Sequence, residues 1–132
     1  MTDGELMESD YQTLAGFRRA LRGFAYFSET AAEGVGLTPQ QHQALLAIKA
    51  ENGLTVGELA DRLLLKPHSA TGLVDRLVKS DLLVRQTSQQ DRRRAELAMT
   101  AKSDGLLKAL SDSHRAELRR LKPLLIELLQ KI

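Results

Sequence analysis

Three consecutive arginines directly follow an aspartate in the stretch from Asp91 to Arg94. A guanidinium group presents its N–H donors in a fixed plane, which matches the oxygens of a carboxylate or a phosphate. An aspartate two residues before an arginine can hold that guanidinium in place, so less side-chain freedom is lost when the arginine binds an anion. Asp91, Arg92, Arg93 and Arg94 are therefore suited to anion binding, although a solvated charge run would have the same composition.

Positive charge is concentrated around this run. From Lys66 to Arg94 the chain has seven basic and three acidic residues, a net charge of +4, whereas the formal net charge of the whole chain is only +2. Such segregation is typical of a surface that binds nucleic acid. The distribution of charge, and not its total, indicates a polyanionic partner.

A second group of candidate binding residues lies on a helix predicted from Pro67 to about Ser80. Its apolar residues form one stripe at helical spacing, and its small and polar residues lie largely off that stripe. Lys66 precedes the helix, where a cation opposes the helix dipole by roughly 0.3–1 kcal/mol. A phosphate at the same place would be favoured by both the lysine and the helix. The candidates are Lys66, His68, Ser69, Thr71, Gly72 and Arg76, with an ordinary solvated helix face as the alternative.

Several function classes find no support in the sequence. There is no cysteine, and His42 and His114 are isolated in predicted helices, so we expect no metal site. No nucleophile–base pairing or glycine-rich phosphate loop is present, so we expect neither an enzyme nor a cofactor. The acidic first ten residues contain no apolar core of signal-peptide length, and no apolar run approaches the roughly 18 residues of a membrane span. We therefore expect a soluble, cytoplasmic chain.

The elements that carry these residues are mainly helical. Apolar spacing predicts a first helix over about 6–33, which "GVGL" ends. "TPQQ" predicts a helix capped by Thr38, and "TVGE" predicts another capped by Thr55. A long leucine-rich helix follows Thr100, and Pro123 is expected to kink or divide it.

Between the fourth and the last helix the pattern changes to two short strands, 82–87 and 94–99, around a polar tip. Ala95, Leu97 and Met99 are expected to anchor this hairpin on the helices. Arg85 is expected to lie opposite Arg94. The order of three helices followed by a hairpin is that of a winged helix-turn-helix.

These stretches resemble the multiple antibiotic resistance regulator (MarR) family of bacterial transcription factors. The resemblance is carried by "LTVGELADRLLLKP", "SATGLVDRLVKSDLLVRQ" and "DRRRAELAMT" together with the flanking helices. The most specific part is the wing signature of an aspartate, any residue and an arginine, followed by leucine, a spacer and leucine-threonine. It maps onto Asp91, Arg93, Leu97, Met99 and Thr100, with methionine in place of the second leucine. Lys66 stands where the family often has a serine cap, and Gly72 where it commonly has a larger polar residue.

The resemblance implies one domain over 1–132, mainly α-helical with a small β-hairpin wing. Its DNA-binding lobe would cover about 37–100, and a helical dimerisation region would cover about 6–33 and 101–132. Apolar positions of the outer helices that would form the homodimer interface are Leu14, Phe17, Leu21, Leu118, Leu121, Leu125 and Leu128.

The implied function is that of a homodimeric regulator, a repressor, which binds a pseudo-palindromic duplex DNA operator. The resemblance also implies a small aromatic or phenolic effector between the dimer helices and the DNA-binding lobe. Two alternatives stay open, a winged-helix module that binds protein and an architectural protein that binds DNA without sequence preference.

Overall fold

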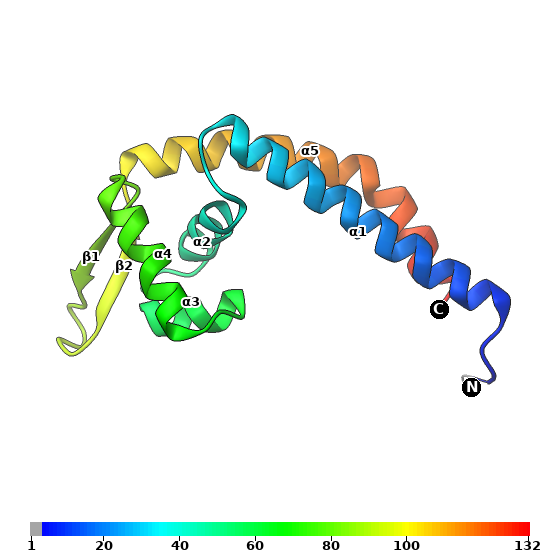
Figure 1. The fold of residues 1–132 in the computed structure, drawn as a ribbon, viewed down its shortest axis with the longest axis horizontal. Coiled ribbons are helices and arrows are strands. Elements are labelled where there is room, and N and C mark those ends of the chain that lie inside the picture. The colour runs from blue at the N-terminus through cyan, green and yellow to red at the C-terminus, as the bar shows by residue number, and fades with distance from the viewer. Residues whose placement is uncertain (1–3) are drawn as a thin grey trace.

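The computed structural model describes residues 4–132. Five helices and one hairpin follow in the order α1 (Glu8–Gly34), α2 (Pro39–Ala50), α3 (Val56–Leu63), α4 (Pro67–Lys79), β1 (Leu83–Thr87), β2 (Ala95–Met99) and α5 (Ala101–Gln130). Figure 1 shows α1 and α5 side by side along the molecule, with the other elements gathered at the end away from the termini. We call α1 with α5 the stalk, and the elements from α2 to β2 the lobe. The predicted mainly α-helical fold with a winged helix is confirmed.

Local side-chain caps determine where three of the helices begin. The Thr38 hydroxyl accepts from the Gln41 N–H at 3.1 Å, and the Gln41 side chain accepts from the Thr38 N–H at 3.0 Å. Thr55 and Glu58 form the same reciprocal pair at the start of α3. Thr100 accepts from the Ser103 N–H at the start of α5. Each pair satisfies backbone donors that a helix start leaves free, so the predicted caps are confirmed.

One apolar core joins the lobe to the stalk. The predicted stripe of α4 is fully buried, and it packs with leucines of α2, α3 and the hairpin. Ala32 of α1 and Leu107 and Leu110 of α5 belong to the same cluster. Because these three side chains are shared, the orientation of the lobe depends on how α1 and α5 pack against it.

The hairpin is a two-stranded antiparallel sheet in which Arg85 faces Leu97, and not Arg94 as predicted. Arg94 lies beyond the strand, where its carbonyl accepts from the Ser88 N–H at 3.0 Å. Leu97 is buried in the core and Met99 is partly buried against it, as expected of anchoring residues. Ala95 is exposed, so its predicted anchoring role is wrong, because it lies at the tip end of β2, outside the apolar core that Leu97 enters.

α5 is continuous through Pro123 up to Gln130, so of the two expected outcomes at this proline, a kink or a division, the division does not occur. A proline removes one helical hydrogen bond, but the turns that follow it are held by packing. Leu128 is buried, and its side chain borders the Cα of Gly16 in α1. This contact stabilises the last turns of α5 against the stalk. Over residues 4–132 no helix is both long and apolar enough to cross a membrane.

Candidate nucleic-acid interface

The exposed side of α4 carries the polar residues that the sequence singled out. His68, Ser69 and Thr71 are exposed, and Gly72 is half-buried. Lys66 occupies the N-cap position, and its side chain makes no capping hydrogen bond to the first turn. The buried stripe holds the opposite side of α4 against the core, so these residues face outwards together from a fixed helix.

Two residues of this face have contacts within the helix that affect what they can offer a ligand. The Thr71 hydroxyl donates to the carbonyl of Pro67 at 3.0 Å. Its oxygen lone pairs and methyl group therefore remain for an outside partner. The guanidinium of Arg76 lies beside Gly72, since a Cβ built on that glycine would be 3.4 Å from Nη1 of Arg76. A larger side chain at position 72 would compete with Arg76 for this space.

The wing tip is an ordered turn built around Ser88. The Ser88 side chain is buried, and its oxygen accepts from the N–H groups of Gln90 and Asp91, each at 3.2 Å. Sequence reasoning did not select Ser88, although a serine three residues before an aspartate between two strands is a turn signal. This turn places Asp91 at the base of the arginine run.

Asp91 orients Arg93, as the spacing predicted. The backbone N–H of Arg93 donates to Oδ1 of Asp91 at 3.0 Å, and Nε of Arg93 donates to the same oxygen at 3.2 Å. The pKa of the Asp91 carboxyl lies below its ordinary value. The larger cause is the hydrogen bond from the Arg93 backbone, and the next is the hydrogen bond from its guanidinium. The Arg93 side chain is nevertheless 92% exposed. Arg92 is exposed as well, so both cations face solvent at the tip.

Arg94 and Arg85 are directed towards the protein instead. Nη2 of Arg94 donates to Oε1 of Glu58 at 2.7 Å and to the Gly53 carbonyl at 3.0 Å. Arg85 pairs with Asp75 of α4 at 2.6 Å. The contacts of both side chains lie within the lobe, and the expected contact of Arg94 with DNA stays a prediction. No local pattern signals the Glu58–Arg94 pair, because the two residues are 36 positions apart.

Comparisons with known proteins agree with this geometry. A family model described as "MarR family" matches residues 35–94, which include α2, α3, α4, β1 and the wing tip. Residues 35–94 are therefore similar to the MarR family. It is 36% identical over 72 residues to the HTH-type transcriptional repressor MdtR of Bacillus subtilis (strain 168), a match that covers 54% of this chain and 46% of MdtR. The chain thus spans about half the length of this curated relative.

Solved structures of similar fold extend the comparison to the stalk. The YusO protein of Bacillus subtilis is 28% identical with a TM-score of 0.65, over 93% of this chain and 87% of that one. A DNA complex of Staphylococcus aureus MepR matches with a TM-score of 0.66 at 21% identity, over 87% of this chain and 92% of MepR. The stalk and the lobe together therefore have the fold of these proteins.

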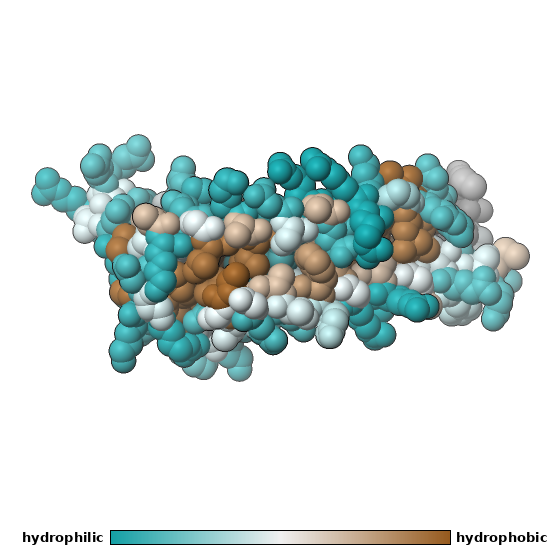
Figure 2. Space-filling view, turned by 90° about the horizontal axis from the view of Figure 1, so that it is seen from above, coloured by the Kyte–Doolittle hydropathy of each residue, from teal (hydrophilic) through white to brown (hydrophobic). Residues whose placement is uncertain are grey.

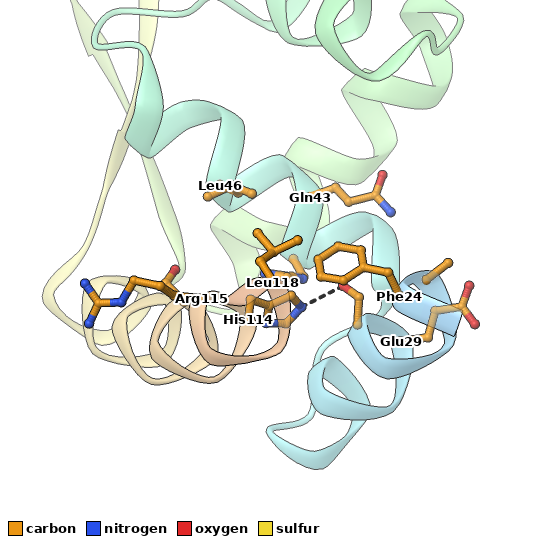
Figure 3. Close-up of a pocket in the computed structure, with 11 residues that line it drawn as sticks. Phe24, Glu29, Gln43, Leu46, His114, Arg115 and Leu118 are labelled. Atoms are coloured by element: carbon orange, nitrogen blue, oxygen red, sulfur yellow. Dashed lines mark hydrogen bonds between the residues drawn. The ribbon is translucent and has the colours of Figure 1, made fainter. Parts of the chain in front are cut away.

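A pocket of about 600 Å³ lies where the lobe meets the stalk. Its lining comes from α1, α2 and α5, and is mostly apolar. Figure 3 shows Phe24, His114 and Leu118 gathered at its centre, whereas the charged ends of Glu29 and Arg115 point outwards on opposite sides. The pocket lies between the helices that the resemblance assigned to dimerisation and the lobe.

Two histidines that the sequence left isolated meet at this pocket. The rings of His42, from α2, and His114, from α5, lie with centroids 4.8 Å apart. Nδ1 of His114 donates to the Leu110 carbonyl at 2.6 Å, and Nε2 lies 2.8 Å from the Ser28 hydroxyl. Nδ1 of His42 is buried and has no hydrogen-bond partner within residues 4–132. The pKa of His42 is lowered, mainly because the ring is buried and in addition because His114 lies nearby.

The outer surface of the stalk exposes the apolar positions expected at a dimer interface. Leu14 is 58% exposed, Leu21 and Leu118 are about half exposed, and Phe17, Leu121 and Leu125 are partly buried. Figure 2 shows apolar side chains among polar ones along the face seen from above. Leu128 differs from this set, because it is buried within the protomer against α1. It is therefore a packing residue of the stalk.

The histidine pair does not form part of a larger metal-ligand group. No cluster of three or more histidine, cysteine, aspartate or glutamate side chains that could hold a metal ion occurs within residues 4–132.

Proposed function

We propose that this protein is a sequence-specific, duplex-DNA-binding transcriptional regulator. The observation that carries the proposal is that one lobe exposes two sets of side chains suited to contact DNA. These are the polar face of α4 and the arginines Arg92 and Arg93 at the tip of a hairpin packed on the same core. An α-helix fits the major groove, where base edges differ in their donors and acceptors. His68, Ser69 and Thr71, on the first turns of α4, are the residues we assign to base edges.

The wing supplies the second part of the proposed contact. Arginine side chains gain from the enhanced negative potential of a narrow minor groove. Arg93, already oriented by Asp91, would enter such a groove with less loss of side-chain freedom than an unrestrained arginine. Lys66 and the first N–H groups of α4 would meet a phosphate.

We propose further that two copies act as a homodimer through the exposed apolar face of the stalk. A two-fold arrangement would present two α4 helices to half-sites about 34–36 Å apart, and hence to a pseudo-palindrome. The exposed side chains of Leu14, Leu21 and Leu118 support this arrangement, since their apolar surface would be buried at the interface.

Selection of duplexes from a random pool, followed by affinity measurement at several salt concentrations, tests this function. A regulator is expected to enrich a palindrome and to lose affinity with salt, with a slope of about −0.9 for each phosphate neutralised. The same slope without an enriched sequence would indicate an architectural DNA-binding protein. Absence of duplex binding at low salt would contradict the proposal and favour a module that binds protein.

We propose that the regulator is a repressor that a small aromatic effector releases. The name of the relative MdtR supports repression. The pocket between α1, α2 and α5 supports the effector, because its apolar lining surrounds two imidazoles and the Ser28 hydroxyl. A ligand there would release DNA only by binding the DNA-free arrangement more tightly than the DNA-bound one.

Benzoate and phenol are suitable probes for this pocket. In transcription in vitro from a promoter that carries the selected duplex, the protein is expected to lower transcript yield, and an effector to restore it. A Leu46→Trp variant, which adds bulk to the pocket from α2, is expected to repress but not to respond. An equal response of wild type and variant would place the effector elsewhere.

A further inference from the structure

Arg94 ends the arginine run, but its side chain is enclosed by groups of the lobe. Only 37% of the side chain is exposed, compared with 92% for Arg93. Its guanidinium reaches the Glu58 carboxylate and the Gly53 carbonyl, and its Nε lies 3.6 Å from Oε2 of Glu96. These partners come from the start of α3, from the loop before it and from β2. Arg94 therefore connects the wing to the segment that leads into α3.

Its main partner is itself fixed in place. The oxygen of Glu58 that accepts from Arg94 also accepts from the Thr55 backbone N–H at 3.0 Å, and the Glu58 N–H donates to the Thr55 hydroxyl. The pKa of Glu58 is lowered, mainly by the hydrogen bond from the Thr55 backbone and next by the hydrogen bond from the Arg94 guanidinium. The Arg94 guanidinium is thus bound to a carboxylate whose position is set by the capping box of α3.

The backbone of Arg94 belongs to the wing tip. Its N–H donates to the Asp91 carbonyl, and its carbonyl accepts from the Ser88 N–H, both at 3.0 Å. A two-stranded sheet is marginally stable alone and takes its position from what it packs against. At the middle of β2, the Leu97 N–H donates to the Leu54 carbonyl at 2.8 Å. Arg94 supplies the tie at the tip end.

We propose that Arg94 is a positioning residue, which fixes the wing tip relative to α3 and α4 so that Arg92 and Arg93 are presented to DNA at a set angle. That this position aids DNA binding rests on the proposed function. That Arg94 fixes the wing tip does not depend on DNA. A planar guanidinium can bind the Glu58 carboxylate and the Gly53 carbonyl at once, which a lysine ammonium does less well. The alternative is that Arg94 leaves Glu58 on binding and contacts a phosphate directly.

Glu58→Gln separates the two explanations, because they predict opposite signs. Removing an acid near DNA favours binding by simple electrostatics. Glutamine keeps the capping box, so α3 is expected to form normally. If Arg94 positions the wing, Glu58→Gln weakens binding to the selected duplex, as Arg94→Gln does, each on the order of tenfold. Glu51→Gln is the matched control, since Glu51 pairs with Arg62 outside the wing, and it is expected to leave the affinity unchanged.

A double-mutant cycle completes the test. If the two residues act through each other, the Glu58→Gln, Arg94→Gln double variant binds DNA about as weakly as either single variant. Tighter binding by Glu58→Gln, or additive effects in the double variant, would overturn the proposal in favour of a direct phosphate contact. Equal thermal midpoints of wild type and variants would show that the losses do not reflect unfolding.

Hydrogen exchange without DNA keeps the inference independent of the proposed function. The amides of Ser88 and Leu97 are expected to exchange faster in Arg94→Gln and in Glu58→Gln, but not in Arg93→Gln. Unchanged protection of the Ser88 amide in Arg94→Gln would overturn the positioning role. A wild-type protein that binds no duplex, but shows this exchange pattern, would refute the proposed function and retain the role of Arg94 in the wing.

Discussion

Arg92, Arg93 and Arg94 are adjacent in the chain, but each side chain meets different surroundings. Arg92 is exposed, Arg93 is oriented by Asp91 while it stays exposed, and Arg94 is bound to Glu58. The run of charge and the Asp91–Arg93 spacing were evident from the sequence, because those two residues interact locally. The inward direction of Arg94 was not, since its partners are brought to it by the packing of the hairpin on α3.

The first prediction concerns Arg93 as a phosphate-neutralising cation. In Arg93→Ala, the log–log slope of DNA affinity against salt is expected to become less steep by about 0.9 for each protomer in contact with DNA. Fluorescence anisotropy of a labelled duplex at five or more salt concentrations measures this slope. Lys108→Ala removes an exposed cation of α5 that pairs with Asp112, and it is expected to leave the slope unchanged. An unaltered slope in Arg93→Ala would refute the contact.

The second prediction concerns the pH dependence of stability at His42. The unfolded chain takes up a proton at this residue near pH 6.5, whereas the folded protein resists it because the pKa of the buried ring is lowered. The unfolded state therefore binds more protons, and stability is expected to fall as the pH drops below about 6.5. Above that pH the residue is neutral in both states and has no such effect. Glu29 of α1 and Arg115 of α5, the charged residues of the pocket lining, lie nearby with outward-pointing ends.

Thermal unfolding from pH 7.5 down to pH 5 measures this effect. His42→Phe keeps a flat ring but cannot titrate, so it is expected to lose less stability across the window than the wild type. His68→Gln serves as the control, since His68 is exposed on α4, and it is expected to retain the wild-type profile. Parallel profiles for wild type and His42→Phe would contradict the assignment to His42.

At the scale of elements, short-range signals predicted the helix starts well. The capping pairs at Thr38 and Thr55 join residues three positions apart, so no tertiary contact is needed to form them. The strand register was harder to predict from the sequence, because it is fixed by the turn at Ser88 and by the hydrogen bond from the Leu97 N–H to the Leu54 carbonyl. The continuity of α5 through Pro123 likewise depends on contacts with α1.

The third prediction concerns the backbone conformation at the end of α3 and its effect on stability. Leu64 has the left-handed conformation, with φ of 56° and ψ of 41°, and it is 92% exposed. This conformation costs a residue with a Cβ about 1–2 kcal/mol, and asparagine tolerates it better. Leu64→Asn is expected to raise the free energy of unfolding by about 0.5–1 kcal/mol, since little packing is lost. Chemical denaturation measures the change.

Leu64→Val is the matched substitution for this position. A β-branched side chain is particularly disfavoured at positive φ, so this variant is expected to be less stable than the wild type. If both substitutions changed stability in the same direction, the explanation based on backbone conformation would be wrong.

At the scale of the whole molecule, the fourth prediction is that exposed leucines of the stalk hold two copies together. Leu14 and Leu21 lie two helical turns apart on α1, and both are exposed in the single chain. If they are buried between two copies, the Leu14→Glu, Leu21→Glu double variant is expected to have a monomeric mass where the wild type is dimeric. Sedimentation equilibrium over a range of concentrations measures the mass.

The dimer interface has a control substitution and a result that would contradict it. Leu64→Glu places a charge on a still more exposed leucine outside the stalk, and it is expected to leave the mass unchanged. A wild-type mass that is monomeric at all concentrations would refute the homodimer. In a dimeric wild type, the monomeric double variant is expected to bind a palindrome more weakly, because the two α4 helices are no longer linked.

The sequence by itself determined the helix starts, the buried stripe of α4, the hairpin and the pairing of Asp91 with Arg93. Each of these depends on residues a few positions apart, and local backbone geometry brings such residues together whatever the rest of the chain does. The tertiary structure alone decided that Arg94 binds Glu58, that His42 meets His114, and that Leu128 is buried while Leu14 is exposed. These relations join distant segments, and they follow from how the hairpin packs on α3 and from how α1 and α5 pack on each other and on the lobe.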